Sequence, residues 1–183
     1  MSFKVQRSRR KLCPFEKSRS SNRHPVIFFI SYENHDEGLI TGLLEPLFES
    51  EFQGHIDKPL YWKRSNVGGA PPWRQIYQWI RQCDGVLVLI TQNAVKNPNN
   101  ILREVRYARR FCKPIFPLMD WRLSWEELGR FKAWQKRFTF KRLNLYDEEP
   151  KPYDEFGRQL LELPDEKTVF TQILREHYNH LII

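Results

Sequence analysis

The sequence predicts an α/β protein in which a central parallel sheet of four to five strands is covered by helices on both faces. Two short, continuous apolar runs, at 26–30 and 85–91, are typical of strands that are buried on both sides. Amphipathic helical patterns separate the apolar runs along the chain. Alternating strands and helices are the order that a parallel sheet with helical crossovers requires, so we expect a flavodoxin-like three-layer fold.

The first part of the chain supplies two strands and two helices. After the strand at 26–30, apolar residues recur at helical spacing through about residue 52. A short strand at 60–62 leads into the loop at 63–72, where paired glycines allow unusual backbone angles and prolines stiffen the entry to a helix. That helix begins at Trp73, and its apolar residues again follow the helical period.

The middle of the chain contains the clearest strand, at 85–91. A polar loop at 92–99 follows it, and then a helix from about Ile101. One face of this helix is apolar and the opposite face is basic. A further strand is expected at 114–119.

The last part of the chain is less regular. Ser124 and Glu127 have the spacing of a capping box, which predicts a helix start. A fifth strand is possible at 137–141. The segment 144–164 is rich in charge and proline and is expected to be a loop, before an amphipathic helix at 169–178.

The charge of the chain is concentrated at its start. The formal net charge is +8, but residues 1–24 hold eight Lys or Arg and one Glu, which leaves 22 basic and 21 acidic side chains elsewhere. We expect residues 1–24 to be a basic, solvated leader and residues 25–183 to be one domain. Because the domain is near neutral, we predict no specific nucleic-acid partner, although the leader could contact an anionic membrane or nucleic acid.

Cysteine usage and hydropathy indicate a cytoplasmic protein. The three cysteines, Cys13, Cys83 and Cys112, are odd in number and lack CxxC spacing, which argues against a disulfide framework and a cysteine-based zinc site. No transmembrane segment is expected, since no stretch approaches the roughly 18 apolar residues that span a bilayer. The sequence also has no dinucleotide fingerprint, P-loop or nucleophile elbow.

Two remote segments can form a site at one edge of the predicted sheet. The first strand ends in Ser31 and Tyr32, and Glu104 lies on the helix that follows the strand at 85–91. Carboxyl ends of parallel strands open onto the same edge, where ligands bind. On a helical wheel Glu104 lies at the rim of the apolar stripe, where we expect a half-buried carboxylate with a raised pKa. The alternative is a surface glutamate paired with Arg103 or Lys113.

These residues resemble those of the TIR (Toll/interleukin-1 receptor) domain family over roughly residues 25 to 180. The features in common are Ile30-Ser31-Tyr32 followed by Asp36, the paired glycines Gly68-Gly69 ahead of Trp73, and Glu104 on the third helix. The family's helix motif often reads S-x-W-C-x-x-E, and Asn100 replaces its tryptophan in this chain.

The resemblance implies an NAD+ glycohydrolase, like the NAD-cleaving bacterial and plant-type members. Such an enzyme releases nicotinamide and ADP-ribose or a cyclic ADP-ribose signal, with Glu104 as the catalytic carboxylate. NAD+ is then the substrate, and no cofactor or metal is expected. The implied setting is an immune or antiviral defence pathway, in which self-association or another TIR domain, together with a separate upstream activator, switches the enzyme on.

A single carboxylate is chemically sufficient for this reaction. Ordinary glycosidases need two, because one must protonate a poor leaving group. Nicotinamide leaves a pyridinium as a neutral base, so one anion near the ribose can stabilise the developing positive charge.

The other candidate site residues have alternative structural roles. Tyr32, Trp62 and Trp73 could stack on substrate or could only pack in the core. Arg64, with its neighbour Lys63, could bind a pyrophosphate or could simply be solvated. The list of candidate substrate-binding residues is Ser31, Tyr32, Trp62, Arg64, Gly69 and Trp73.

Asp36 is expected to cap the first helix. The Gly68-Gly69 loop could also be an association surface, which leaves a noncatalytic TIR adaptor or scaffold as the alternative function. A receiver-like phosphoacceptor would need acidic residues at the first and third strand ends, where the sequence has Ser31 and Thr91.

Overall fold

Four parallel strands form the centre of the computed structural model, which describes residues 24–62, 73–143 and 165–178. Two isolated parallel bridges, Val26 to Ile56 and Phe29 to Leu60, place the 56–60 segment along the other side of the first strand. Counted as a strand, this segment gives the flavodoxin-like order 2-1-3-4-5, which confirms the predicted fold class. Across the described sheet the strands are β1 (Phe28–Ser31), β2 (Gly85–Ile90), β3 (Ile115–Asp120) and β4 (Lys141–Leu143).

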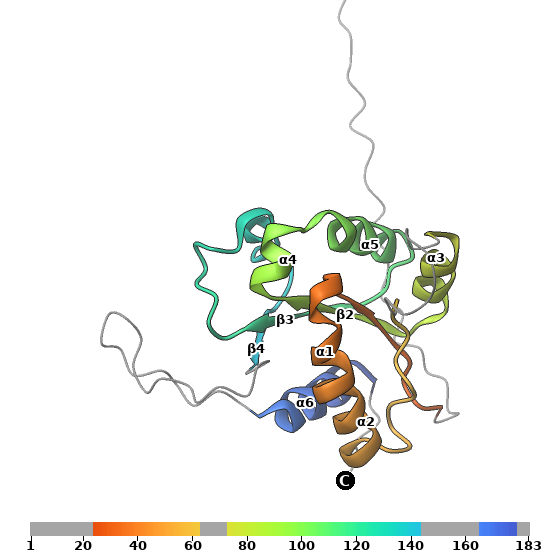
Figure 1. The fold of residues 1–183 in the computed structure, drawn as a ribbon. Coiled ribbons are helices and arrows are strands. Elements are labelled where there is room, and N and C mark those ends of the chain that lie inside the picture. Colours follow the sequence, from red (N-terminus) through yellow and green to blue (C-terminus); the bar gives the residue numbers. More distant parts are fainter. Residues whose placement is uncertain (1–23, 63–72, 144–164, 179–183) are drawn as a thin grey trace, which may run out of the picture.

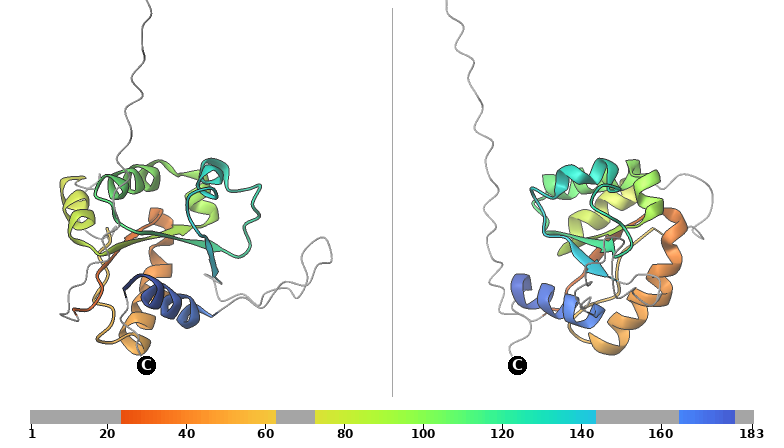
Figure 2. Two further views of the ribbon diagram at one scale, coloured as in Figure 1. Left: turned by 180° about the vertical axis from the view of Figure 1, so that it is seen from behind. Right: turned by 90° about the vertical axis from the view of Figure 1, so that its left-hand side faces the viewer.

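The helices form a layer on each face of this sheet (Figures 1 and 2). One layer holds α3 (Trp73–Gln82), α4 (Gln92–Lys96), α5 (Asn99–Arg110) and the 3₁₀-helix η3 (Gly129–Trp134). The other layer holds α1 (Glu37–Leu39), η2 (Ile40–Leu44), α2 (Glu45–Glu51) and α6 (Glu166–Tyr178). The short 3₁₀-helix η1 (Asn34–Asp36) joins β1 to α1.

Alternate residues of the central strands pack into the two layers. Phe28, Ile30 and Leu87 belong to the core on the α2 and α6 side. Phe29 and Val88 belong to the core on the α3 and α5 side. Because both faces are covered, every residue of β2 is fully buried, which is why the strand is a continuous apolar run in the sequence.

The predicted first helix is a nearly continuous helical segment from Glu37 to Glu51 that includes a π-helical turn. In η2, the Glu45 N–H donates to the Ile40 carbonyl, five residues back. Pro46 has no N–H to donate to the Gly42 carbonyl, so regular α-helical hydrogen bonding is interrupted there in any case. The hydrogen bond of the π-helical turn is donated by Glu45, the residue directly before this proline.

Three expected elements differ in detail. The predicted polar loop at 92–99 contains α4, because the Thr91 side chain accepts a hydrogen bond from the Ala94 N–H and so caps a short helix. The capping box is present, since Ser124 N–H donates to Glu127 Oε2 at 2.7 Å and Glu127 N–H donates to Ser124 Oγ at 3.3 Å. It starts a series of turns and then η3 rather than an α-helix.

The last strand also lies later than expected. The sequence predicted it at 137–141, and β4 spans Lys141–Leu143. Three residues suffice to pair with the end of β3, where Asp120 lies opposite Leu143.

The cysteine prediction needs one correction. Cys83 is a buried free thiol, but Cys112, just after α5, takes part in a disulfide. The odd count and the lack of CxxC spacing argued against a disulfide framework, and this one residue departs from that expectation. None of the helices in the described ranges is long and apolar enough to cross a membrane.

Several predictions fall on residues outside the described ranges. These are the basic leader up to residue 23, the Gly68-Gly69 loop, and the charged segment 144–164.

Candidate functional site

A hydrogen bond between β1 and α5 joins the two remote segments of the predicted site. Ser31, the last residue of β1, donates from Oγ to Glu104 Oε2 at 2.5 Å. The Ser31 side chain is 0% exposed and Glu104 is 6% exposed. The carboxylate therefore points inward, at the carboxyl edge of the sheet, between the end of β1 and α5.

The apolar face of α5 carries Glu104 to this position. Ile101, Val105 and Ala108 are buried against the strands, and Glu104 lies beside them on the helix. The sequence placed this side chain at the half-buried rim of the core, but it is almost completely buried. Neither alternative partner pairs with it, because Arg103 binds Tyr77 and the Lys113 ammonium donates to the Cys83 carbonyl.

Burial raises the pKa of Glu104 to about 8, and the hydrogen bond from Ser31 offsets only part of this rise. A carboxylate in an apolar site loses water that no protein group fully replaces. Ser31 is the only described residue that hydrogen bonds to Glu104. In the ligand-free protein at neutral pH the carboxyl group is therefore mostly protonated.

A narrow pocket opens onto Glu104. Its hollow measures about 300 Å³ when the part open to solvent is included, but the space that water can occupy is about 10 Å³. That is room for about one water molecule. The lining residues are Phe29, Ile30, Tyr32, Asn34, Trp62, Ile76, Asn100 and Glu104.

Two of the predicted aromatic residues form a wall of this pocket. The Tyr32 hydroxyl donates to the Trp62 carbonyl, which ties the end of β1 to the segment after Leu60. Burial, more than the nearby carboxylates, raises the pKa of Tyr32, so the phenol stays protonated and keeps this hydrogen bond. The Trp62 ring packs on Trp79 with 6.3 Å between ring centroids.

The remaining predicted substrate-binding residues do not line the pocket or lie outside the described residues. Trp73 packs beside Tyr77 with 5.8 Å between ring centroids, and its ring lies under Arg103. Arg64 and Gly69 are outside the described ranges, so their roles stay predictions.

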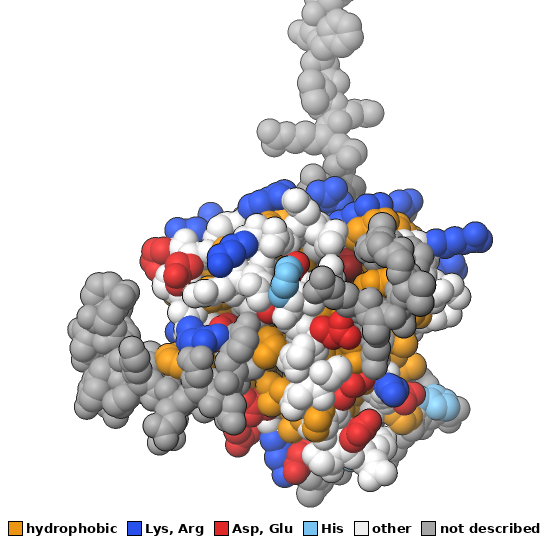
Figure 3. Space-filling model, viewed as in Figure 1, with side chains coloured by type: hydrophobic (Ala, Val, Ile, Leu, Met, Phe, Trp, Pro, Cys, Tyr) orange, Lys and Arg blue, Asp and Glu red, His pale blue; other side chains and the backbone are white. Residues whose placement is uncertain are grey.

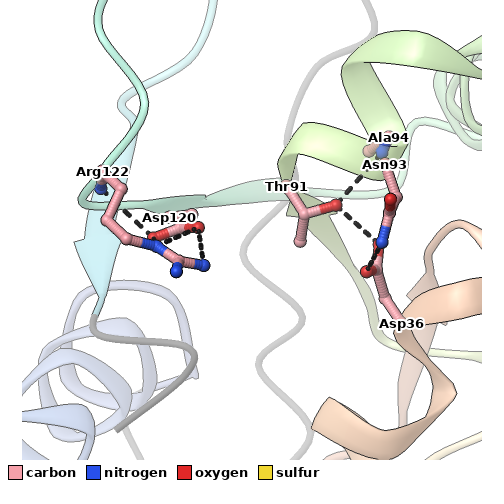
Figure 4. Close-up of polar contacts among 6 residues, drawn as sticks. All are labelled: Asp36, Thr91, Asn93, Ala94, Asp120 and Arg122. Carbon is pink, nitrogen blue, oxygen red and sulfur yellow. Dashed lines mark hydrogen bonds and ion pairs between the residues drawn. The ribbon is translucent and has the colours of Figure 1, made fainter. Parts of the chain in front are cut away.

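Asp36 does not cap the first helix as predicted. Its side chain makes no cap hydrogen bond, and Glu33 instead accepts from the His35 N–H at the start of η1. The buried Asp36 carboxylate accepts from Thr91 Oγ1 at 2.6 Å and from Asn93 Nδ2 at 2.7 Å (Figure 4). It therefore joins the turn after β1 to the end of β2, at the point where the strand order reverses.

A third carboxylate at the same edge was not singled out from the sequence. Asp120, the last residue of β3, is fully buried and forms an ion pair with Arg122, whose Nη2 lies 2.9 Å from Oδ2 (Figure 4). The Arg122 N–H also donates to Asp120 Oδ1 at 3.2 Å. The sequence signal that could have identified Asp120 is an acidic residue directly after an apolar run.

A second hollow is larger but lies at the opposite edge of the sheet. It is lined by residues of α2 and of the 53–59 segment, close to Val26, which precedes β1. Ligand sites of open parallel sheets lie at the carboxyl edge, so this amino-edge hollow is the weaker candidate. Among residues 24–62, 73–143 and 165–178, no group of three potential ligand residues could hold a metal ion.

Comparisons with known proteins find similarity among the solved structures. No protein-family model matches the chain, and no curated protein matches it. Among solved structures, the fold is similar to that of the TIR domains in a structure described as the activated Roq1 resistosome directly recognizing the pathogen effector XopQ. The TM-score is 0.41 and the identity 13%, over 61% of this chain and 72% of that chain. The fold class follows from the sheet order, independently of this likeness.

Proposed function

We propose that the protein is a TIR-type NAD+ glycohydrolase in which Glu104 is the catalytic carboxylate. The observation that carries this proposal is a nearly buried glutamate that faces a pocket at the carboxyl edge of the sheet, held by one hydroxyl and by no described cation. Carboxylates kept at such an energetic cost are typical of functional sites. The resemblance of the Ser31-Tyr32 and Glu104 segments to TIR domains supports the choice of reaction.

The reaction needs little from the protein beyond this anion. The bond between ribose C1′ and the nicotinamide nitrogen breaks, and the bonding electron pair neutralises the pyridinium. Glu104, oriented by Ser31, stabilises the positive charge that develops on the ribose. Water then adds to C1′ and loses a proton, which gives ADP-ribose. Attack by the adenine ring of the same molecule would instead give a cyclic product.

The raised pKa of Glu104 fits a cationic substrate. In the free protein the proton on Glu104 removes the cost of a buried charge. A bound pyridinium supplies an opposite charge, which lowers the pKa of Glu104 and favours loss of that proton. Substrate binding therefore favours the carboxylate form of Glu104 when the cationic substrate is in the pocket.

The small size of the pocket supports activation by assembly. Space for about one water molecule does not admit a nicotinamide ring. The side chains of Trp62 and Asn100 line the pocket, so a shift of either would widen it. We propose that association with another copy or another TIR domain, after an upstream signal, stabilises this wider state.

The experiment is to measure nicotinamide release by the full chain at high protein concentration, for the parent and for Glu104→Gln. Glutamine keeps the size of the side chain and its hydrogen bond to Ser31 but cannot become an anion. We expect a loss of about 10²- to 10³-fold. The matched control is Glu127→Gln, since Glu127 is an exposed carboxylate that does not line the pocket. Equal release by parent and Glu104→Gln would contradict the proposal.

A noncatalytic TIR adaptor is the second candidate. The observation that favours it is the nearly closed pocket, together with Asn100 at the position where the resembling family often has tryptophan. On that reading Glu104 is a protonated structural group. A parent protein that binds TIR partners, but releases no nicotinamide even when assembled, would support the adaptor.

A further inference from the structure

Arg103 is held in a fixed orientation by aromatic side chains of α3. Its guanidinium carbon lies 3.8 Å from the centroid of the Trp73 ring and 5.7 Å from that of Tyr77. Arg103 Nε donates to the Tyr77 hydroxyl at 2.7 Å. Tyr77 is itself stacked on Tyr107, with 3.8 Å between centroids and 14° between the ring planes. The guanidinium is thus supported on one face and at one nitrogen.

The other two guanidinium nitrogens are unoccupied within the described part of the chain. Arg103 is exposed, and among residues 24–62, 73–143 and 165–178 its only hydrogen bond is the one from Nε. A stacked arginine has already lost much of its rotamer freedom, so binding a ligand costs less entropy. The planar fork that remains matches two oxygens of a phosphate group.

This cluster adjoins the rim of the Glu104 pocket. Asn100 and Glu104 line the pocket from α5, and Arg103 lies between them on the same helix. Ile76 lines the pocket from α3, with Trp73 one helical turn before it and Tyr77 directly after it. The stacked guanidinium is therefore on the side of the pocket where α3 and α5 meet.

The surface around Arg103 attracts anions. The only acidic residue in either helix is Glu104, which is buried and mostly protonated at neutral pH. Basic side chains line the upper margin of the molecule over these helices (Figure 3). Within the described residues none of the other arginines of the two helices forms an ion pair, and a surface of one charge sign raises the local concentration of anionic ligands. The exposed arginines of α3 and α5 are Arg74, Arg81, Arg103, Arg106, Arg109 and Arg110.

We propose that Arg103, stacked on Trp73 and Tyr77, binds the diphosphate of the substrate. This inference rests on the proposed function and specifies the ligand as a nucleoside diphosphate ester, such as the ADP-ribose part of NAD+. In that ligand the diphosphate is attached to the ribose whose C1′ reacts, so an anion-binding group is needed beside the carboxylate. Trp73 then supports the guanidinium instead of stacking directly on substrate.

The first test is binding of ADP-ribose to the full chain, measured by calorimetry without any turnover. Arg103→Gln should weaken binding about 10-fold or more, as expected for loss of a charge-assisted contact. The matched control is Arg106→Gln, which removes another exposed arginine of α5 that no described aromatic ring supports. It should change binding less than about twofold. Circular dichroism would verify that each variant is folded.

The second test separates charge from orientation. Arg103→Lys keeps the charge but loses the planar fork, and Trp73→Leu keeps the arginine but removes its support. Both should weaken ADP-ribose binding, and in turnover assays Arg103→Gln should raise KM for NAD+ with little change in kcat. Nicotinamide riboside lacks the diphosphate, so its kcat/KM should be the same for the parent and for Arg103→Gln.

The outcomes distinguish this inference from the proposed function. If ADP-ribose binds equally to the parent, Arg103→Gln and Arg106→Gln, or fails to bind the parent at millimolar concentration, the Arg103 site is overturned. If binding depends on Arg103 while the assembled parent releases no nicotinamide, the phosphate site stands and the catalytic proposal fails.

Discussion

Two buried carboxylates at the same edge of the sheet, Glu104 and Asp120, are in opposite electrostatic situations. Asp120 is fully buried but has Arg122 beside it and a backbone N–H donating to it. Glu104 is nearly as buried, yet among the described residues it has only the Ser31 hydroxyl. A buried carboxylate that is paired with a cation is a structural feature. A buried carboxylate without a cation has a raised pKa and is available for chemistry.

Asp36 is an intermediate case. Its carboxylate is buried and accepts from two neutral donors, Thr91 and Asn93, at the end of β2. These contacts hold the turn after β1 in place, and that turn includes Asn34 of the pocket lining. Asp36 is thus a positioning residue.

Removing the cation from Asp120 should have the largest effect on stability. Arg122→Met leaves a buried carboxylate without its ion pair, which should cost about 3–5 kcal/mol in the free energy of unfolding. Chemical denaturation at pH 7 measures this cost. Lys132→Met, at an exposed position, is the control and should have little effect. A cost below about 1 kcal/mol would mean that Asp120 is not held by its ion pair.

At Glu104 we expect a substitution to increase the stability of the protein rather than to decrease it. The folded-state pKa of about 8 exceeds the usual 4.5, so the folded protein binds the extra proton and loses stability as pH rises between these values. Glu104→Gln removes this loss, and should stabilise the protein by about 3–5 kcal/mol at pH 9 and hardly at all at pH 4. Denaturation curves of parent and variant at both pH values would reveal it. A stability difference that is independent of pH would show that Glu104 titrates normally.

Removing a contact of Asp36 should cost less stability than removing the ion pair of Asp120. Thr91→Val removes one donor to Asp36 and also the acceptor that caps α4. The combined cost should be about 2 kcal/mol, measured by thermal or chemical denaturation. Thr139→Val is a control, since this exposed side chain makes no hydrogen bond with a described residue. Equal stability of Thr91→Val and the parent would remove Asp36 from the positioning role.

The smallest expected effect is a shift in the pH dependence of catalysis. If Glu104 acts as an anion, kcat/KM for NAD+ should rise with pH and level off above about pH 8. Ser31→Ala removes the hydrogen bond that favours the carboxylate, so the pKa of Glu104 rises and the rising limb should move to higher pH. If kcat/KM rises over the same pH range for Ser31→Ala and for the parent, another group controls the rate.

Local sequence patterns predicted most of the fold. Continuous apolar runs identified β1 and β2 because both faces of the sheet are covered, and helical periodicity identified α3, α5 and α6. The prediction missed the short α4, because the segment at 92–99 is mostly polar and indicated a loop. There the cue was Thr91, a residue type that often caps helices.

The site was predictable only in part. Glu104 and Ser31 could be placed at one edge because parallel topology brings remote strand ends together. The depth of Glu104 depends on how closely α5 packs on the sheet, which a helical wheel does not give. The Asp36 contact to Thr91 spans 55 residues, and the Arg103 contact with Trp73 depends on how α3 lies against α5. No local pattern encodes either pairing.

The most direct test of the central claim is an NMR titration of the Glu104 carboxyl carbon in the free protein and in the presence of NAD+ with a non-hydrolysable linkage. An unpaired, desolvated carboxyl group should titrate with a pKa of about 8 in the free protein, and the pyridinium should lower this pKa on binding. A pKa near 4.5 that the ligand leaves unchanged would contradict the account, because Glu104 would then be an ordinary solvated glutamate.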